Sequence, residues 1–420
     1  MMRSLFSAVS GLRAHQTRMD VIGNNIANVN TPGYKSSRVT FQEVFSQTLR
    51  GASSPTGTNM QERGGTNPLQ VGLGVTIASI DTIQTPGNLQ PTSRLTDVAI
   101  EGNGFFVVSD GGRQAYTRVG NFTVDGDGVL VDYEGRKVLG WSADSAGTLP
   151  ADRSERNLGP ITIAVGSNMP ASATKNVSWI KNLDAEAAVG TVKTTTATVY
   201  DSLGATHVVT IEFRKTAMNE WSWTATAVTG AASPPSPPDN YGNGILQFDS
   251  SGALSSTAGS TQVSFNPTTG AAPVAIDMDF DSVTQVAGPT TIETGVVDGW
   301  PTGTLESFTF DSTGTISGFY SNGMNRVLGQ IALANFPNPG GLQKAGKSLF
   351  VESNNSGDPD IGVAGTSGRG TIAPSSLEMS NVDLAEEFTQ MIITQRGFQA
   401  NSRIITVSDE LLQELVNLKR

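Results

Sequence analysis

The chain contains no cysteine among its 420 residues and only two histidines. Disulfides, thiolate metal sites and thiol nucleophiles are therefore excluded. Charged residues make up 15% of the sequence, well below the usual quarter. No apolar run approaches the roughly 18–20 residues that a helical membrane span needs, so we expect no membrane span. These absences leave few of the residue types on which catalysis and metal binding depend.

Positive charge is also scarce. The sequence has 27 basic and 38 acidic residues, a formal net charge of −11, and no run of Lys or Arg longer than two. This balance argues against a nucleic-acid groove, which needs clustered Lys and Arg. The first residues do not resemble a cleavable signal peptide, because Arg13, Arg18 and Asp20 interrupt apolar residues that lie at helical spacing. If the protein is exported, we expect a route that does not read such a signal.

What the sequence does contain is an apolar seam at each end. Near the start, apolar side chains and one histidine alternate steps of three and four: Leu5, Ala8, Leu12, His15, Met19, Ile22, Ile26 and Val29. This pattern predicts a helix from about Ser4 to Val29. The helix should stop at Asn30-Thr31-Pro32-Gly33, since Pro-Gly favours a type II turn.

Near the other end, five apolar residues recur every seven positions: Leu384, Met391, Phe398, Ile405 and Leu412. Phe388 and Val416 fill some of the intervening seam positions, and Ile404, Leu411, Leu415 and Leu418 widen the apolar stripe. The segment Ser380-Asn-Val-Asp383 is interpreted as a capping box that starts this helix, which should run to about Leu418. A helix with an apolar seam needs a partner, so we expect the two ends to pair with each other, with other copies, or both.

Between these ends the apolar period changes to two, which predicts short antiparallel strands. One turn recurs, in which Asp ends a strand and Gly follows three residues later: Asp125/Gly128, Asp201/Gly204, Asp249/Gly252 and Asp311/Gly314. Glycine suits this position because it adopts a positive φ without strain. The segment Val39–Leu49 fits either a helix or a strand, and residues 51–70 have the composition of a linker.

If the terminal helices lie together, the chain goes out and comes back, and each layer between is built from two segments. The predicted fold class is mainly β with a terminal α-helical coiled coil and nested discontinuous domains. The predicted layers are a helical base (1–32 with 378–420), a linker layer (33–72 with 366–377), a proximal β domain (73–158 with 300–365) and a distal inserted β domain (159–299).

Few residues of the sequence suggest a catalytic or ligand-binding site. His15 occupies a seam position, where a polar group usually sets register, and His207 begins a predicted strand beside Asp201. Asp125-Gly-Asp127-Gly128 has too few carboxylates for a calcium loop. Four tryptophans could form a sugar platform, although core packing is their commoner use: Trp179, Trp221, Trp223 and Trp300. We expect no catalytic, cofactor-binding or metal site, and we expect that the protein is not an enzyme.

Two long motifs make the sequence recognisable. Ser4-Leu-Phe-Ser-Ala-Val-Ser-Gly-Leu12 followed by Asn24-Asn-Ile-Ala-Asn-Val-Asn-Thr-Pro-Gly-Tyr-Lys35 resembles the N-terminal signature of the bacterial flagellar rod and hook axial proteins. Ser380 to Leu384, Gln395 to Asn401 and Leu415 to Leu418 are similar to their C-terminal signature. The family-motif residues are Asn24, Asn25, Ala27, Asn28, Asn30, Thr31, Pro32, Gly33, Tyr34 and Lys35.

Within that family, the length and the distal domain favour a hook subunit. The resemblance implies a curved tubular homopolymer that joins motor to filament and encloses an export channel. It also implies rod, hook-cap and hook–filament junction proteins as partners, and type III export to an extracellular position. A distal rod subunit is the alternative, because residues 51–70 resemble an insertion of distal rod proteins. A secreted β-rich polysaccharide-active enzyme or adhesin is the alternative from another class, but it would not need seams at both termini.

Overall fold

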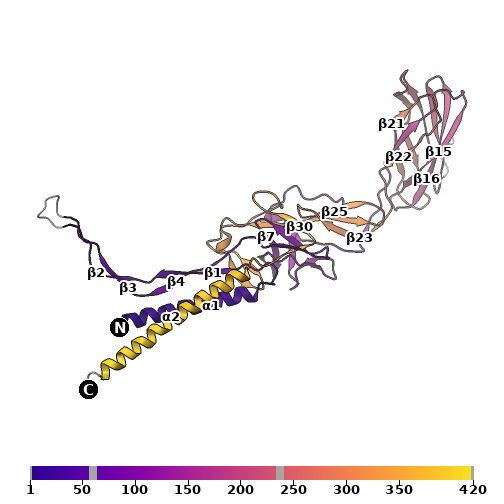
Figure 1. Cartoon of the computed structure of the whole chain (residues 1–420). Helices are drawn as coiled ribbons and strands as arrows, with labels where there is room; N and C mark the ends of the chain where they lie inside the picture. The colour runs from indigo at the N-terminus through magenta and orange to yellow at the C-terminus, as the bar shows by residue number, and fades with distance from the viewer. Residues whose placement is uncertain (1, 56–63, 233–240, 418–420) are drawn as a thin grey trace. The chain divides into compact units, whose positions relative to one another are not determined.

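The fold comes from a computed structural model of the whole chain, which describes residues 2–55, 64–232 and 241–417. They divide into two compact units. Unit 1 comprises Met1–Ile163, Thr309–Ser317 and Val327–Arg420, and unit 2 comprises Ala164–Phe308 and Gly318–Arg326. Strands dominate the chain between two terminal helices, α1 (Met2–Ala27) and α2 (Leu384–Asn417) (Figure 1). The predicted fold class, mainly β with terminal helices, is confirmed.

Both helix boundaries have a clear local cause. After α1, Gly33 has a φ of 66°, and the Tyr34 N–H donates to the Thr31 carbonyl at 3.3 Å, as the Pro-Gly turn predicts. Before α2, the Asp383 carboxylate accepts a hydrogen bond from the Ala385 N–H at 2.8 Å. The predicted capping box is therefore wrong, because Asp383 itself is the N-cap. The predicted end at Leu418 lies outside the described residues.

A two-stranded ribbon lies against α1. It pairs β1 (Ser37–Glu43) with β4 (Val75–Thr82), and a second hairpin pairs β2 (Ser46–Arg50) with β3 (Leu69–Gly72). The segment that fitted either helix or strand is thus strand. Part of the predicted linker, residues 56–63, lies outside the described residues. The Val75 N–H donates to Ser10 Oγ at 3.2 Å, which fixes the ribbon to the helix.

The rest of unit 1 is a β domain built from early and late segments of the chain. Its main sheet has the order β25 (Asn325–Ile331), β11 (Lys137–Ser142), β7 (Phe105–Asp110), β8 (Arg113–Thr117), β28 (Leu349–Val351) and β27 (Gln343–Gly346). Short strands flank it: β9 (Thr123–Val124), β10 (Leu130–Val131), β12 (Gly159–Pro160), β26 (Leu333–Asn335) and β29 (Asp360–Gly362). Buried aromatic side chains fill its core, including Phe105, Tyr116, Trp141, Phe336 and Phe350.

Two further pairs join the outgoing chain to the returning chain in unit 1. Strand β5 (Leu89–Pro91) pairs with β31 (Ser376–Glu378), and β6 (Val98–Glu101) pairs with β30 (Thr371–Pro374), both antiparallel. Each pair brings together segments that lie more than half the chain apart. The residues just before α2 are therefore held beside those that follow the ribbon.

Most of the described strands of unit 2 form two sheets. One is an antiparallel meander of β15 (Val192–Tyr200), β16 (Thr206–Ala217), β17 (Glu220–Val228), β18 (Gly242–Phe248) and β19 (Leu254–Gly259). The other has the order β20 (Gln262–Phe265), β21 (Val274–Thr284), β14 (Asn176–Asn182) and β22 (Glu293–Val297). Strand β13 (Asn168–Met169) pairs with β23 (Gly303–Phe310), and β24 (Thr315–Tyr320) has residues in both units.

Tryptophans and phenylalanines from both sheets of unit 2 form one core. Trp179, Trp221 and Trp223 are fully buried there, beside Phe213 and Phe280. These rings cannot stack on a sugar, because no face of them reaches the surface. Three of the four tryptophans that could have formed a sugar platform are therefore unavailable to a sugar.

The recurring Asp-x-x-Gly turn has the same geometry at each predicted position. In the first copy the Asp125 carboxylate accepts hydrogen bonds from the Asp127 and Val129 N–H groups at 3.0 and 2.7 Å. The glycines have φ values of 80°, 84°, 84° and 78° at Gly128, Gly204, Gly252 and Gly314. The carboxylate thus satisfies the turn's own backbone donors, which is a structural role.

We predict that Asp125→Ala lowers the free energy of unfolding of unit 1 by about 1 kcal/mol, since two turn N–H groups lose their acceptor. Hydrogen exchange of the Val129 amide should become faster. The matched control is Asp127→Ala in the same turn, where only the backbone N–H contributes to the hydrogen bonds. Equal destabilisation by the two substitutions would contradict this account of the turn.

Candidate assembly site at the terminal helices

The two terminal helices pack against each other as an antiparallel pair. Ascending α1, Gly11 lies against Asn401, His15 against Gly397, and Arg18 donates to Gln390 Oε1 at 2.5 Å. The order on α2 is therefore reversed. The two seams predicted from the sequence thus come from helices that do meet within one chain.

The contact between the helices depends on small residues. A Cβ added at Gly11 would lie 2.7 Å from the Asn401 side chain, and one at Gly397 would lie 2.7 Å from the His15 ring. At such distances a methyl group would fit only if the facing side chain moved. Ala8, Thr394 and Ser408 are also buried. Ala8 belongs to the predicted seam, whereas Gly11, Thr394, Gly397 and Ser408 were missed in the sequence, although Thr394 and Gly397 lie three residues apart, as the helix period requires.

The predicted seam residues divide between covered and exposed positions. On α1, Ile22 is buried, and the other five are half-buried: Leu5, Leu12, Met19, Ile26 and Val29. On α2, Met391, Ile405 and Leu412 are half-buried. The other four α2 seam residues are exposed: Leu384, Phe388, Phe398 and Val416. Their role in assembly stays a prediction, but the structure leaves them available to another chain.

Further apolar side chains extend the exposed surface of α2. They are Ile392, Ile393, Ile404, Val407 and Leu411. Contiguous apolar surface of this kind marks interaction sites on soluble proteins. The helix pair therefore buries one side of α2 and leaves many large apolar side chains exposed on the rest of its surface.

The family motif lies where α1 ends and α2 begins, and we call this region the junction (Asn25, Gly33, Lys35, Arg118, Glu378, Asn381 and Glu387). Lys35 and Glu378 form an ion pair with Nζ and Oε1 2.6 Å apart, and both side chains are completely buried. Arg118 Nε lies 3.4 Å from Glu378 Oε2, with the guanidinium 2% exposed. One buried carboxylate thus forms ion pairs with two cations from other parts of the chain.

Burial shifts the titration of these cations. It lowers the pKa of Lys35, although the charge of Glu378 acts in the opposite direction, and it lowers the pKa of Arg118 against the same opposing charge.

Hydrogen bonds to the backbone complete the junction. Lys35 Nζ donates to the Thr85 carbonyl at 2.8 Å, and the Gly87 N–H donates to Glu378 Oε1 at 2.8 Å. Glu378 therefore joins β31 to the segment between β4 and β5.

Asn25 and Asn381 make the remaining contacts of the junction. Asn25 Nδ2 donates to Glu387 Oε1 of α2 at 2.8 Å and to the Ser37 carbonyl at 2.8 Å. Asn381 accepts from the Ser36 N–H at 2.8 Å and donates to the Ile83 carbonyl at 2.9 Å. Each amide bridges two separate segments, which explains why a shorter or apolar side chain would not replace it.

The other motif residues shape the turn after α1. Tyr34 donates its hydroxyl to Asn24 Oδ1 at 2.7 Å, and Thr31 donates to Asn28 Oδ1 at 3.1 Å. The Gly33 N–H donates to the Glu378 carbonyl at 2.8 Å. Pro32 is half-buried, while Ala27 and Asn30 are exposed and make no side-chain hydrogen bond that the described residues record. The motif therefore serves mainly to connect α1 to the returning chain.

The two histidines have structural surroundings. His207 is buried, and its ring nitrogens lie 2.6 Å from the Thr229 carbonyl and 3.1 Å from Asp201 Oδ2. His15 packs edge-on against Phe41, and burial lowers its pKa below 6.5, with the charge of Arg18 lowering it further. Within the described ranges, no group of three His, Asp or Glu side chains could hold a metal ion, and no helix is long and apolar enough to cross a membrane.

Four family profiles match separate parts of the chain, including both ends. They are described as flagella basal body rod protein (residues 5–35), flagellar hook protein FlgE/F/G D1 domain (99–177), flagellar basal body protein FlaE D2 domain (168–300) and flagellar basal body rod FlgEFG protein C-terminal (373–418). The two terminal matches fall on α1 with its turn and on β30, β31 and α2. They are the segments that meet at the junction.

Full-length relatives agree with these profiles. The chain is 43% identical to the flagellar hook protein FlgE of Borreliella burgdorferi, with all of both chains covered. It is 40% identical to the flagellar hook protein FlgE of Treponema pallidum, again over all of both chains. It is also 32% identical to the flagellar basal-body rod protein FlgG of Bacillus subtilis, with all of both chains covered.

We predict that Glu378→Gln lowers the free energy of unfolding of unit 1 by about 3–5 kcal/mol, because two buried cations lose their counter-charge. Lys35→Met should cost less, since Glu378 keeps Arg118. The control is Asp81→Asn, whose partner Arg38 lies 3.8 Å away in an exposed pair, and which should change the unfolding free energy by less than about 1 kcal/mol. Similar effects of Glu378→Gln and Asp81→Asn in denaturant unfolding would refute this role.

We also predict that the helix pair weakens as the pH falls. Because the folded pKa of His15 lies below 6.5, the unfolded state binds a proton more readily, and stability is lost below that pH. Thermal loss of the helix signal in circular dichroism should occur at a lower temperature at about pH 5.5 than at about pH 7.5. In His15→Gln, the contribution of His15 to this difference in melting temperature between the two pH values should disappear. An unchanged pH difference in the variant would rule His15 out as its source.

Proposed function

The chain belongs to the FlgE/F/G family of flagellar hook and rod proteins, and we propose that its copies polymerise into the hook through the two terminal helices. Its full-length relatives include proteins named flagellar hook protein. The chain is thus a structural subunit of the bacterial flagellar hook. The observation that supports the proposed route of assembly is the exposed apolar side of α2, above all Phe388, Ile392 and Phe398.

This apolar side needs a partner that the single chain does not supply. Phe388 is 50% and Ile392 58% exposed although both stand on a regular helix. At about 25 cal/mol for each Å² of apolar surface buried, covering several such side chains gives a substantial driving force for association. Neighbouring copies carry the same helices, so they are the partners we propose.

The geometry of a tube requires two different contact surfaces on each subunit. Identical surfaces that face each other close into a dimer, whereas different surfaces repeat without limit and build a helical polymer. The exposed side of α2 and the outer side of α1 with its ribbon are two such different surfaces. We therefore place the helices at the inner wall of the tube, around the export channel, and the β domains outside it.

The nested layers predicted from the sequence remain part of this proposal. They are the helical base (1–32 with 378–420), the linker layer (33–72 with 366–377), the proximal β domain (73–158 with 300–365) and the distal β domain (159–299). Pairing of β5 with β31 and of β6 with β30 supports layers made from two segments each. We propose that the Gly- and polar-rich segments between them allow the tube to bend as a universal joint.

We propose the rod, hook-cap and hook–filament junction proteins as neighbours, because the chain has relatives named for both the hook and the rod. We further propose that the flagellar type III apparatus exports the chain to its extracellular position.

A distal rod subunit is the second candidate function. The match to the Bacillus subtilis protein, which is named a rod protein and covers this chain completely, favours it. Hook and rod subunits would both polymerise through the same helices. Complementation of strains that lack either protein distinguishes them, because we expect this chain to restore hooks in a strain that makes a normal rod.

We propose that the protein has no enzymatic activity. Its family is structural, and His207 is 1% exposed, with both ring nitrogens engaged by other groups. Three tryptophans that could have stacked on a sugar are buried in the core of unit 2. The work of the protein is therefore mechanical and depends on contacts between copies.

We predict that removing residues 384–420 abolishes polymerisation and leaves both β cores folded. Near-ultraviolet circular dichroism of the buried tryptophans should remain unchanged, while electron microscopy should show no tubes. Tubes made by the truncated chain would contradict the proposal.

A further inference from the structure

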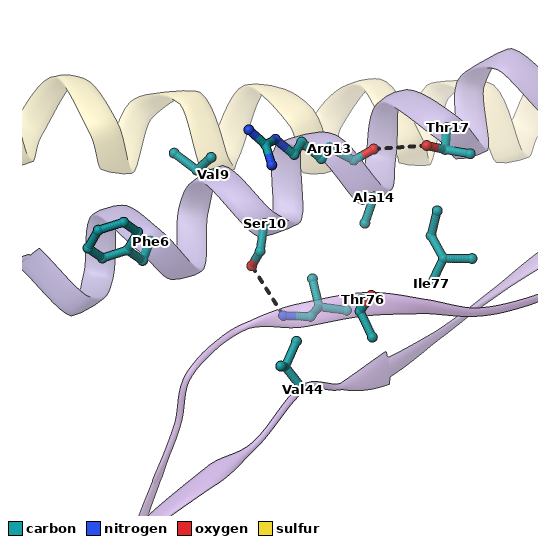
Figure 2. A pocket seen from close by; sticks show the side chains of 10 residues that line it. Phe6, Val9, Ser10, Arg13, Ala14, Thr17, Val44, Thr76 and Ile77 are labelled. Atoms are coloured by element: carbon teal, nitrogen blue, oxygen red, sulfur yellow. Dashed lines mark hydrogen bonds between the residues drawn. The ribbon is translucent and has the colours of Figure 1, made fainter.

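A groove lies between α1 and the ribbon, on the side of α1 away from α2 (Figure 2). It has a volume of about 410 Å³, and its walls are mostly apolar: Phe6, Val9, Ser10, Arg13, Ala14, Thr17, Val44, Val75, Thr76 and Ile77. Phe6 is 68% exposed although it is the largest side chain of the wall. The groove is thus an apolar surface without a partner in the single chain.

One cation stands in this groove. Arg13 belongs to the wall formed by α1, and Figure 2 shows its guanidinium beside Val9 and Ser10. Among the ion pairs of the described residues, none involves Arg13. A ligand with a narrow apolar ridge and a carboxylate near one end would satisfy both features of the groove.

The second half of α2 carries such a ridge. Ile404, Val407 and Leu411 follow steps of three and four, so they lie on one side of the helix, and they are 43%, 51% and 45% exposed. We call these three residues the ridge. Glu410 and Glu414 stand at its C-terminal end and are exposed, while Arg403 precedes it. The charged side chains beside the ridge are therefore positive before it and negative at its C-terminal end. Arg13 can attract only the C-terminal end.

The ridge does not fill the groove of its own chain. Asn401 lies against Gly11 and the helices are antiparallel, so the ridge lies beside the first residues of α1 and overlaps the groove only at its end near Phe6. All three ridge side chains remain exposed there. A second chain could bring its ridge to this groove by a shift of a few residues along the helices.

We propose that the ridge of one copy docks into the groove of the next copy, with Arg13 pairing with Glu410 or Glu414 of that second copy. This inference rests on the proposed function and adds the two surfaces that meet. Ridge and groove are different surfaces of the same chain, so their contact is heterologous and repeats around an open helical tube. The pair of charges fixes the direction in which the ridge enters.

The absence of cysteine allows a direct test. Chains carrying only Thr76→Cys, on the groove wall, are mixed with chains carrying only Val407→Cys, on the ridge, and are polymerised and mildly oxidised. Mass spectrometry should detect a disulfide-linked peptide that joins positions 76 and 407 from two chains. The matched control replaces Thr76→Cys by Ile80→Cys, which lies four residues further along the same strand, about 13 Å away, and should give little of the linked peptide.

The outcomes separate this inference from the proposed function. Tubes that form without a 76–407 link, or with as much 80–407 link, would overturn the groove and leave hook assembly intact. A 76–407 link within one chain, tested in the double variant as monomer, would show that the groove belongs to the chain's own ridge. Failure of the unmodified protein to form tubes would overturn the proposed function and the groove together.

A charge reversal tests the ion pair separately. Arg13→Glu should raise the concentration needed for polymerisation roughly tenfold, since like charges then meet in the contact. Adding Glu410→Lys and Glu414→Lys should restore assembly, which also shows that the variant chain folds. The control is Arg3→Glu, an exposed residue of α1 outside the groove. If Arg13→Glu behaves like Arg3→Glu, or if the compensating substitutions restore nothing, the pairing is refuted.

Discussion

The structure depends on one buried carboxylate. Glu378 stands just before α2 and is held by Lys35, which follows α1, and by Arg118 from the β domain. A charge in so dry a position is tolerated only with its partners in place, because an unpaired buried ion costs several kcal/mol. This requirement makes the junction specific. The outgoing and returning ends of the chain meet in a single arrangement, from which the helix pair extends.

The helix pair that follows is built from small and polar side chains. Glycines face Asn401 and His15, and the small polar residues Thr394 and Ser408 of α2 are buried. Packing of this kind brings the helices close together but uses few of their large apolar residues. Those residues are left on the outside of α2. If the helix pair buried all of its large apolar side chains within one chain, little apolar surface would remain to drive polymerisation. The packing of α1 on α2 through small side chains therefore leaves the surface through which copies associate.

Much of this organisation could be predicted from the sequence. The period of apolar residues marked both helices, and the Asp-x-x-Gly repeats marked turns whose carboxylates cap their own backbone, as at Asp125 and Asp311. Periodicity shows which side of a helix is apolar, but it does not show which side meets the partner within the same chain. Gly11, Gly397 and Thr394 were missed for that reason. Glu378 was missed because one acidic residue in an acidic sequence carries no local signal, and its role arises only when distant segments meet.

The central claim is that the apolar side of α2 is open in the single subunit and covered in the tube. Ile393 is one of these exposed apolar residues and is 53% exposed. Because the chain has no cysteine, Ile393→Cys places a single reactive thiol there, and its rate of alkylation can be measured in monomer and polymer. The account predicts rapid labelling in the monomer and strong protection in the tube. Equal labelling rates in the two states would show that this surface stays in solvent and would contradict the account.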